Sequence, residues 1–244
     1  GNGAVVAYRR FVAGLGNVQV EGYEVFVRKD APGVDNLATY LPGKTALTAV
    51  GSNMQYFLNA CLTKNGVKPS SVQMVNLKPP NIVTAADGGQ GDIISDWYPF
   101  IEEIKASGKY KSICSRNDQV GINTYDFYVV RPAFAQENPE AVVAFIKALY
   151  RMNDMLRTRL NEALPLAERY FKEIGLKLDP AIVKGGFGTA LYPSIEDSIK
   201  RITSGEVATA LKQTSEFLVE IGSLEKKPEI NFVTAKYLEL AKAK

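Results

Sequence analysis

The chain has 244 residues, of which 46% are hydrophobic and 23% charged, and its formal net charge is +3. This composition is that of a globular protein with one large or two smaller domains. The small basic surplus, without a block of five or six Lys or Arg residues, argues against a nucleic-acid-binding protein. The chain has no histidine, so chemistry that depends on imidazole is excluded and an enzyme becomes less expected.

Helical and strand patterns alternate along the first half of the chain, which favours an α/β fold. The predicted strands cover about residues 23–29, 45–50, 72–77, 91–96, 111–115 and 125–131. The predicted helices cover about 4–15, 36–41, 54–65, 81–87 and 99–107, and the first of them is expected to end at Gly14 and Gly16. From about residue 139 the pattern is helical to the end, over 139–156, 162–175, 193–203 and 206–222, with breaks at Pro180, Gly185-Gly186 and Gly205.

Two of the predicted strands resemble each other. YEVFVRK (23–29) and YDFYVVR (125–131) share a Tyr-acid-apolar-aromatic-Val order, and each is followed within three residues by proline. The similarity is either chance or the mark of two strands that cross between two lobes in opposite directions. The second interpretation divides the chain into 1–27, the remainder of lobe one, 28–125, lobe two, and 126–244, which returns to lobe one and adds C-terminal helices. It predicts a two-lobed protein with a cleft at the hinge.

The segment Gly51-Ser52-Asn53 stands between a predicted strand and a predicted helix. The first N–H groups of a helix have no partner within it, and the helix dipole makes that end partly positive. An anion could therefore be bound there, with glycine allowing close approach. The alternative is a tight turn followed by an ordinary N-cap, because Ser and Asn are common capping residues.

Two further polar and aromatic segments stand near strand ends. Trp97, the only tryptophan, lies in DWYPF (96–100) after a predicted strand, where ligands tend to bind in α/β sheets. Asn123 and Tyr125 lie in NTYD (123–126), at the start of the second predicted crossing strand. Core packing of the aromatic side chains and simple turn formation are the alternatives for these segments.

The two cysteines are not arranged as C-x-x-C. Cys61 falls on the apolar face of the predicted helix 54–65, which favours a buried structural thiol. A disulfide between Cys61 and Cys114 is the alternative, and the spacing of two cysteines does not decide their pairing.

The order of the motifs resembles that of the substrate-binding proteins of ABC importers for nitrate, sulfonate and taurine-like compounds. The similar segments are the Gly51-Ser52-Asn53 turn with Tyr56, NACLTKNGVKPSSVQMVNL, GQGDIISDWYPF, YDFYVVRPAFAQENPEAVVAFIKAL and LKQTSEFLVEIGSLEKKPEI. The resemblance runs from about residue 20 to the end. Asn53 and Gln55 stand where the family often has Thr and His, and Tyr98 stands where a Glu is common, which leaves the exact ligand open.

The resemblance implies a periplasmic-binding-protein-like (type II) fold with two crossing hinge strands and the ligand held between two lobes. The implied ligand-binding residues are Gly51, Ser52, Asn53, Tyr56, Trp97, Asn123, Tyr125, Asn2 and Gly3. Family members usually carry a further segment before the position of Gly1. Without that segment, lobe one would be incomplete and would have an exposed sheet edge.

The function implied is that of a periplasmic or otherwise extracytoplasmic solute-binding protein, which would close on a small anionic or aromatic-acid ligand and dock on a membrane permease. No metal, cofactor or nucleic acid is implied. No apolar stretch approaches the ~18–20 residues that span a bilayer, and no basic-then-apolar signal segment precedes residue 20. One alternative is an enzyme on the same fold, similar to desulfinases or pyrimidine-synthesising enzymes, with Cys61, Cys114 or a carboxylate as the reactive group. Another is a ligand-sensing regulatory domain.

Overall fold

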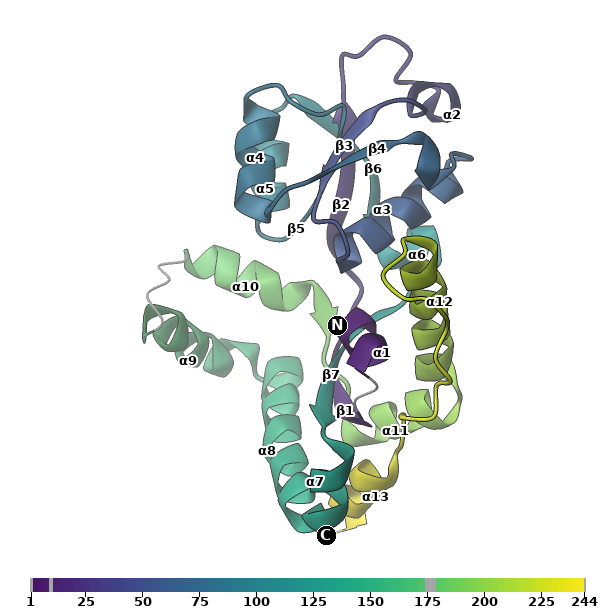
Figure 1. Ribbon diagram of the computed structural model, residues 1–244. Coiled ribbons are helices and arrows are strands. Elements are labelled where there is room, and N and C mark those ends of the chain that lie inside the picture. Colours follow the sequence, from purple (N-terminus) through teal and green to yellow (C-terminus); the bar gives the residue numbers. More distant parts are fainter. Residues whose placement is uncertain (1, 9–10, 174–178, 244) are drawn as a thin grey trace. The chain divides into compact units, whose positions relative to one another are not determined.

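Figure 1 shows the computed structural model, which describes residues 2–8, 11–173 and 179–243. Contacts within the chain divide it into two compact units, one formed by residues 1–19 with 124–244 and the other by residues 20–123. The chain therefore passes between the units twice, once before each of the two Tyr-acid-apolar segments. The lobe boundaries expected at 27/28 and 125/126 stay predictions.

The unit of residues 20–123 is built on a five-stranded sheet with the strand order β4-β3-β5-β2-β6. Its strands are β2 (Glu21–Arg28), β3 (Thr45–Thr48), β4 (Gln73–Asn76), β5 (Ile93–Trp97) and β6 (Tyr110–Arg116). Strand β3 runs parallel to β4 and β5, whereas β2 runs antiparallel to β5 and β6. Its helices are α2 (Leu37–Tyr40), α3 (Asn53–Lys64), α4 (Pro79–Asp87), α5 (Phe100–Ala106) and α6 (Asn117–Val120).

Helices cover both faces of this sheet (Figure 1). Helices α4 and α5 cover one face, and their buried side chains form an apolar cluster with Phe26, Leu47 and Ile94 of the strands. Helix α3 covers the other face. The predicted apolar stripe of α3 is confirmed, because all of its members are buried: Met54, Phe57, Leu58, Cys61 and Leu62.

The other unit contains a three-stranded antiparallel sheet with the order β7-β1-β8. Its strands are β1 (Phe11–Gln19), β7 (Thr124–Val130) and β8 (Ala190–Leu191). Its helices are α1 (Asn2–Tyr8), α7 (Pro132–Glu137), α8 (Pro139–Thr158), α9 (Leu160–Glu173), α10 (Pro180–Gly188), α11 (Ile195–Thr203), α12 (Glu206–Glu220) and α13 (Lys236–Ala243). The predicted helices from residue 139 onward thus correspond to α8, α9, α11 and α12.

The helix predicted for residues 4–15 is wrong in its second half. Helix α1 ends at Tyr8, and Phe11 begins strand β1, which pairs with β7. Gly14, expected to end the helix, lies inside the strand, where a Cβ atom would meet the Tyr150 ring at 3.0 Å. Tertiary pairing with β7 and the close approach of an aromatic ring therefore override the local helical pattern.

Two predicted breaks lie inside helix α10. Gly185 and Gly186 belong to this helix, and Pro180 lies in its first turn. Proline is accepted in the first turn because the N–H that it lacks has no partner there. Glycine weakens a helix by about 1 kcal/mol relative to alanine without forbidding it. Residues 174–178, which include the predicted end of the helix 162–175, lie outside the described part of the chain.

Strand β7 is an edge strand of the three-stranded sheet, with β1 as its neighbour. Large apolar side chains are exposed on and near it: Val129 is 47% exposed, Phe134 40% and Phe145 62%. Edge strands that carry exposed apolar side chains can associate with other polypeptide segments.

Candidate functional site

The carboxyl ends of β3 and β5 meet at one edge of the five-stranded sheet, because the two strands are parallel neighbours. The Gly51-Ser52-Asn53 segment follows β3, and Trp97 ends β5. Strand β2 runs the other way, and Tyr23 near its start lies directly opposite Trp97 in the ladder. The structure thus brings together Ser52, Asn53, Trp97 and Tyr23 at the edge where α/β sheets bind ligands.

The turn before α3 is held by two side chains, those of Gln55 and Asn76, for which the sequence did not predict this role. Gly51 has a φ of +77°, a left-handed conformation that favours glycine. Its N–H donates to Oε1 of Gln55 at 2.7 Å, and the N–H of Val50 donates to Oδ1 of Asn76 at 3.0 Å. The Gly51 N–H is therefore engaged within the protein, and the amide side chains fix the backbone on which the helix begins.

Ser52 is the N-cap of α3, as one of the two interpretations expected. Its Oγ accepts from the N–H of Met54 at 3.0 Å and donates to the carbonyl of Ala49 at 2.6 Å. The N–H groups of Asn53 and Gln55 have no acceptor among the described residues. The Ser52 cap engages one N–H group of the first turn, that of Met54. Other N–H groups of the same turn can therefore still bind an anion.

Asn53, Tyr23 and Trp97 lie on one face of the sheet. Nδ2 of Asn53 is 3.4 Å from the Tyr23 hydroxyl, and the Tyr23 ring centroid is 5.8 Å from that of Phe57 on α3. Tyr23 and Trp97 are each half-buried. This arrangement offers an amide, a phenol and an indole ring, which suits a ligand with a polar head and an apolar part. Tyr23 was missed, although its place at the start of YEVFVRK already put it at a strand end.

Two other predicted residues of this unit have different surroundings. Tyr56 belongs to α3 and is 8% exposed, and its backbone N–H donates to the Ser52 carbonyl at 3.2 Å. Asn123 is exposed and is the last residue of the unit. Their contact with a ligand stays a prediction.

Asn2, Gly3 and Tyr125 belong to the other unit. Oδ1 of Asn2 accepts from the backbone N–H of Tyr125 at 3.1 Å, and its Nδ2 donates to Oγ1 of Thr214 at 3.1 Å. The Tyr125 hydroxyl donates to Glu206 at 2.6 Å, and burial together with this carboxylate raises the pKa of Tyr125. Asn2 and Tyr125 thus join α1, β7 and α12. The contact of Asn2, Gly3 and Tyr125 with a ligand stays a prediction.

Asp96 is a buried carboxyl group that the sequence analysis passed over. The residue is 0% exposed, and Oδ2 has no hydrogen-bond partner among the described residues. Burial raises the pKa of Asp96 to about 7, although the N–H of Trp97 donates to Oδ1 at 2.8 Å and lowers it, while Glu103 raises it further. The opposite residue in the ladder, Glu24, pairs instead with Lys105 at 2.7 Å.

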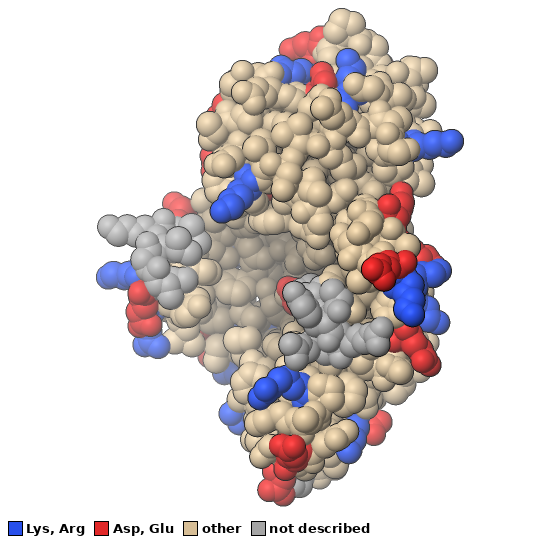
Figure 2. Space-filling view, in the orientation of Figure 1, with Lys and Arg blue, Asp and Glu red and all other residues tan. Residues whose placement is uncertain are grey.

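Charged side chains of both signs are interspersed on the face in Figure 2. No group of three or more Cys, Asp or Glu side chains that could hold a metal ion occurs within residues 2–8, 11–173 and 179–243. In the same ranges, none of the helices has the length and apolar character needed to cross a bilayer.

The profile of the NMT1/THI5-like family matches residues 13–157, which is more than half of the chain. The chain belongs to this family. The NMT1/THI5-like protein is also 32% identical over 189 residues to the taurine-binding periplasmic protein of Escherichia coli strain K12, a match that covers 75% of the chain and 58% of that relative. The resemblance predicted from the motifs is therefore confirmed. The chain spans less than two thirds of the relative's length.

Solved structures share the fold of this NMT1/THI5-like protein. The periplasmic aliphatic sulphonate binding protein SsuA from Escherichia coli has a TM-score of 0.70 and 18% identity, over 91% of the chain and 68% of SsuA. The desulfurization enzyme DszB has a TM-score of 0.64 and 13% identity, over 96% of the chain and 79% of DszB. At these identities the comparison shows the fold alone, and the predicted periplasmic-binding-protein-like fold is confirmed.

Proposed function

We propose that this NMT1/THI5-like protein is the solute-binding component of an ABC importer and captures a small sulfonate-type anion. The observation that carries the proposal is the convergence of Ser52, Asn53, Tyr23 and Trp97 at the carboxyl edge of the five-stranded sheet. The 32% identity to a taurine-binding periplasmic protein supports the ligand class. Taurine, other alkanesulfonates and nitrate are the ligands to test first.

In this proposal the acidic group of the ligand is bound at the start of α3. The N–H groups of Asn53 and Gln55 lack acceptors among the described residues, and the helix dipole favours a negative charge there. The Asn53 amide and the Tyr23 hydroxyl add hydrogen-bonding groups, and the Trp97 ring contacts the apolar part of the ligand. Closure of a second lobe over the ligand would then stabilise the bound state.

An enzymatic function on the same fold is the alternative, since DszB shares the architecture. The chain has two cysteines, and both are used in the Cys61–Cys114 disulfide. Neither thiol is therefore available as a nucleophile. Together with the lack of histidine in the sequence, this favours binding over catalysis.

The partner and the location follow from the same proposal. A permease of an ABC importer would receive the ligand from the protein outside the cytoplasm. The disulfide supports such a location, because disulfides persist in oxidising compartments such as the bacterial periplasm.

Ligand binding by the purified chain tests the proposal. We expect taurine or another alkanesulfonate to raise the melting temperature in a concentration-dependent manner, because a ligand that binds the native state stabilises it. Ser52→Ala combined with Asn53→Ala should weaken binding about tenfold or more, while the loss of the cap costs only about 1 kcal/mol of stability. The control is Asn36→Ala with Ser70→Ala, two exposed positions of the same unit. Unchanged affinity in the Ser52/Asn53 variant would refute the assigned site.

A further inference from the structure

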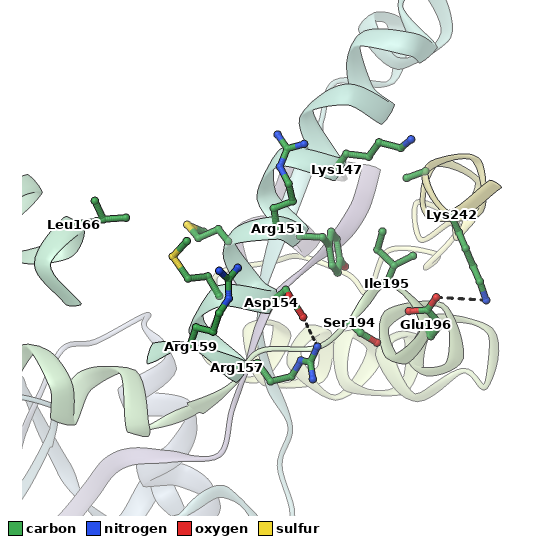
Figure 3. A pocket seen from close by; sticks show the side chains of 14 residues that line it. Lys147, Arg151, Asp154, Arg157, Arg159, Leu166, Ser194, Ile195, Glu196 and Lys242 are labelled. Atoms are coloured by element: carbon green, nitrogen blue, oxygen red, sulfur yellow. Dashed lines mark hydrogen bonds and ion pairs between the residues drawn. The ribbon is translucent and has the colours of Figure 1, made fainter. Parts of the chain in front are cut away.

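A hollow lies in the unit of residues 1–19 and 124–244, which does not contain the sheet edge described above. It has a volume of about 870 Å³ and lies between α8, α9, α11 and α13 (Figure 3). The Tyr150 ring forms part of its wall, and the Tyr150 hydroxyl joins α8 to α11 through a 2.7 Å hydrogen bond to Ser198. The hydroxyl also accepts from the N–H of Leu15 at 2.9 Å, so the wall is fixed to strand β1.

The lining of this hollow is basic. It contains five basic and two acidic side chains: Lys147, Arg151, Arg157, Arg159, Lys242, Asp154 and Glu196. Asp154 pairs with Arg157 at 2.5 Å, and Glu196 pairs with Lys242 at 3.6 Å (Figure 3). Both carboxylates of the lining are therefore already neutralised. Arg159 pairs with Glu162, which is not part of the lining, at 3.1 Å.

Lys147 and Arg151 remain without a carboxylate. Neither has an ion pair or a side-chain hydrogen bond among the described residues, and they project from successive turns of α8 (Figure 3). Like charges four residues apart on a helix repel each other by a few tenths of a kcal/mol. Their charged tips point in different directions in Figure 3, so an anion bound at either one would lessen this repulsion and gain a charge-assisted hydrogen bond.

The hollow also has an apolar side. Met152 and Leu166 line it and are 47% and 49% exposed, and Met155, Ile195 and Ala241 add further apolar surface. Methionine side chains adapt to ligands of different shape because they are flexible and polarizable. A volume of about 870 Å³ lies in the range of ~300–1,000 Å³ that is usual for small-molecule sites.

We propose that this hollow binds an amphipathic organic anion, with its acidic head group at Lys147 or Arg151 and its apolar body against Met152, Met155 and Leu166. Such an anion could be a free alkyl acid or an anionic lipid, because both combine an acidic group with an apolar chain. This site is independent of the Ser52–Asn53 edge and does not require the importer function.

The test is calorimetric titration with monomeric 1-octanesulfonate in the Ser52→Ala/Asn53→Ala background, in which binding at the other proposed site is weakened. We expect 1-octanesulfonate to bind in this background. The double substitution Lys147→Gln with Arg151→Gln should weaken that binding by about tenfold or more, because it removes charge-assisted hydrogen bonds. The matched control is Lys200→Gln with Lys212→Gln, which removes the same charge from positions outside the hollow and should leave the affinity unchanged. Ethanesulfonate, which lacks the long chain, should bind more weakly.

Vesicles distinguish the two sources of the anion. Co-sedimentation with phosphatidylcholine vesicles that contain phosphatidylglycerol, lost in the Lys147/Arg151 variant, would support the site and identify a lipid as its ligand. Binding of monomeric octanesulfonate alone would support the site and identify a free acid. If neither probe binds, or if the Lys147/Arg151 variant binds as tightly as the control, the proposal is wrong.

Discussion

Cys61 on α3 and Cys114 on β6 form a disulfide, with their Cα atoms 6.1 Å apart and a sequence separation of 53. The free buried thiol favoured for Cys61 is therefore wrong, and the open alternative is the one observed. Both cysteines are inside the unit, since Cys61 is 0% and Cys114 2% exposed. The disulfide links α3, the helix that follows the candidate ligand-binding turn, to β6, an edge strand of the five-stranded sheet.

Reduction of this disulfide should destabilise the unit of residues 20–123. A cross-link that closes a loop of this length restricts the unfolded chain and contributes about 2–4 kcal/mol. Urea unfolding with and without a phosphine reductant, and of Cys61→Ala with Cys114→Ala, measures the loss. Two thiols titrated in the denatured, unreduced protein would contradict the disulfide.

Asp96 should make stability depend on pH. Its pKa is about 7 in the folded protein and about 4 in an unfolded chain, so between these values the folded state holds a proton that the unfolded state has lost. The free energy of unfolding should therefore fall as pH rises from about 4 to about 7, by up to about 4 kcal/mol, and stay level above that.

Asp96→Asn tests this dependence, because the amide cannot ionise. We expect the variant to lose that fall between pH 4 and 7 and to be more stable than the unchanged protein at pH 8. The urea unfolding midpoints of both proteins at pH 5 and pH 8 measure this difference in stability. Glu103→Gln is the control, since it removes a neighbouring charge that raises the pKa but leaves the buried carboxyl in place. Parallel pH profiles for the unchanged protein and the Asp96→Asn variant would show that the carboxyl does not titrate as described.

Gly14→Ala should destabilise the unit that contains β1. A Cβ atom at this position would lie 3.0 Å from both Cε2 and the hydroxyl oxygen of Tyr150, and crowding of this kind costs about 1–3 kcal/mol. Gly188→Ala is the matched control, because Gly188 ends α10 and a Cβ there meets nothing within 4 Å. Thermal unfolding of both variants measures the difference. Equal melting temperatures would contradict the close approach of Tyr150.

Trp97→Ala and Tyr23→Phe should separate the two parts of the proposed ligand site. Loss of the indole ring should weaken the binding of a long-chain alkanesulfonate by about 1–2 kcal/mol and change the affinity for nitrate less, because nitrate has no apolar part. Loss of the phenol hydroxyl should instead affect both ligands by about 0.5–1.5 kcal/mol. Competition calorimetry with the two anions measures this pattern. The same loss for both ligands in both variants would argue against separate polar and apolar contacts.

Local sequence patterns predict the structure correctly where they agree with the tertiary packing. The stripe of α3 and the aromatic strands were predicted from periodicity and residue type, and the Ser52 cap was one of two interpretations; the structure shows all three. The prediction is wrong at β1, because the segment that contains Gly14 and Gly16 is a strand and not the end of a helix. These glycines leave room for the rings of Tyr150 and Tyr128. A glycine in a local pattern does not reveal which distant side chain approaches it.

The candidate site likewise combines residues that the sequence pattern indicates with residues whose roles depend on strand pairing. The Gly51–Asn53 turn and Trp97 could be proposed from the sequence because polar and aromatic residues at strand ends are visible in it. Tyr23, Gln55 and Asn76 were not found, because their roles depend on the antiparallel pairing of β2 with β5 and on the parallel pairing of β3 with β4. Strand order is a long-range property that periodicity does not encode.

The sequence by itself determined the alternation of strands and helices, the capped start of α3 and the resemblance to solute-binding proteins, because each depends on neighbouring residues or on their order along the chain. Only the tertiary structure decided the Cys61–Cys114 pairing, the burial of the Asp96 carboxyl and the cluster of basic side chains on α8 and α13. These features join residues that are distant in the chain, so the packing of whole elements determines them.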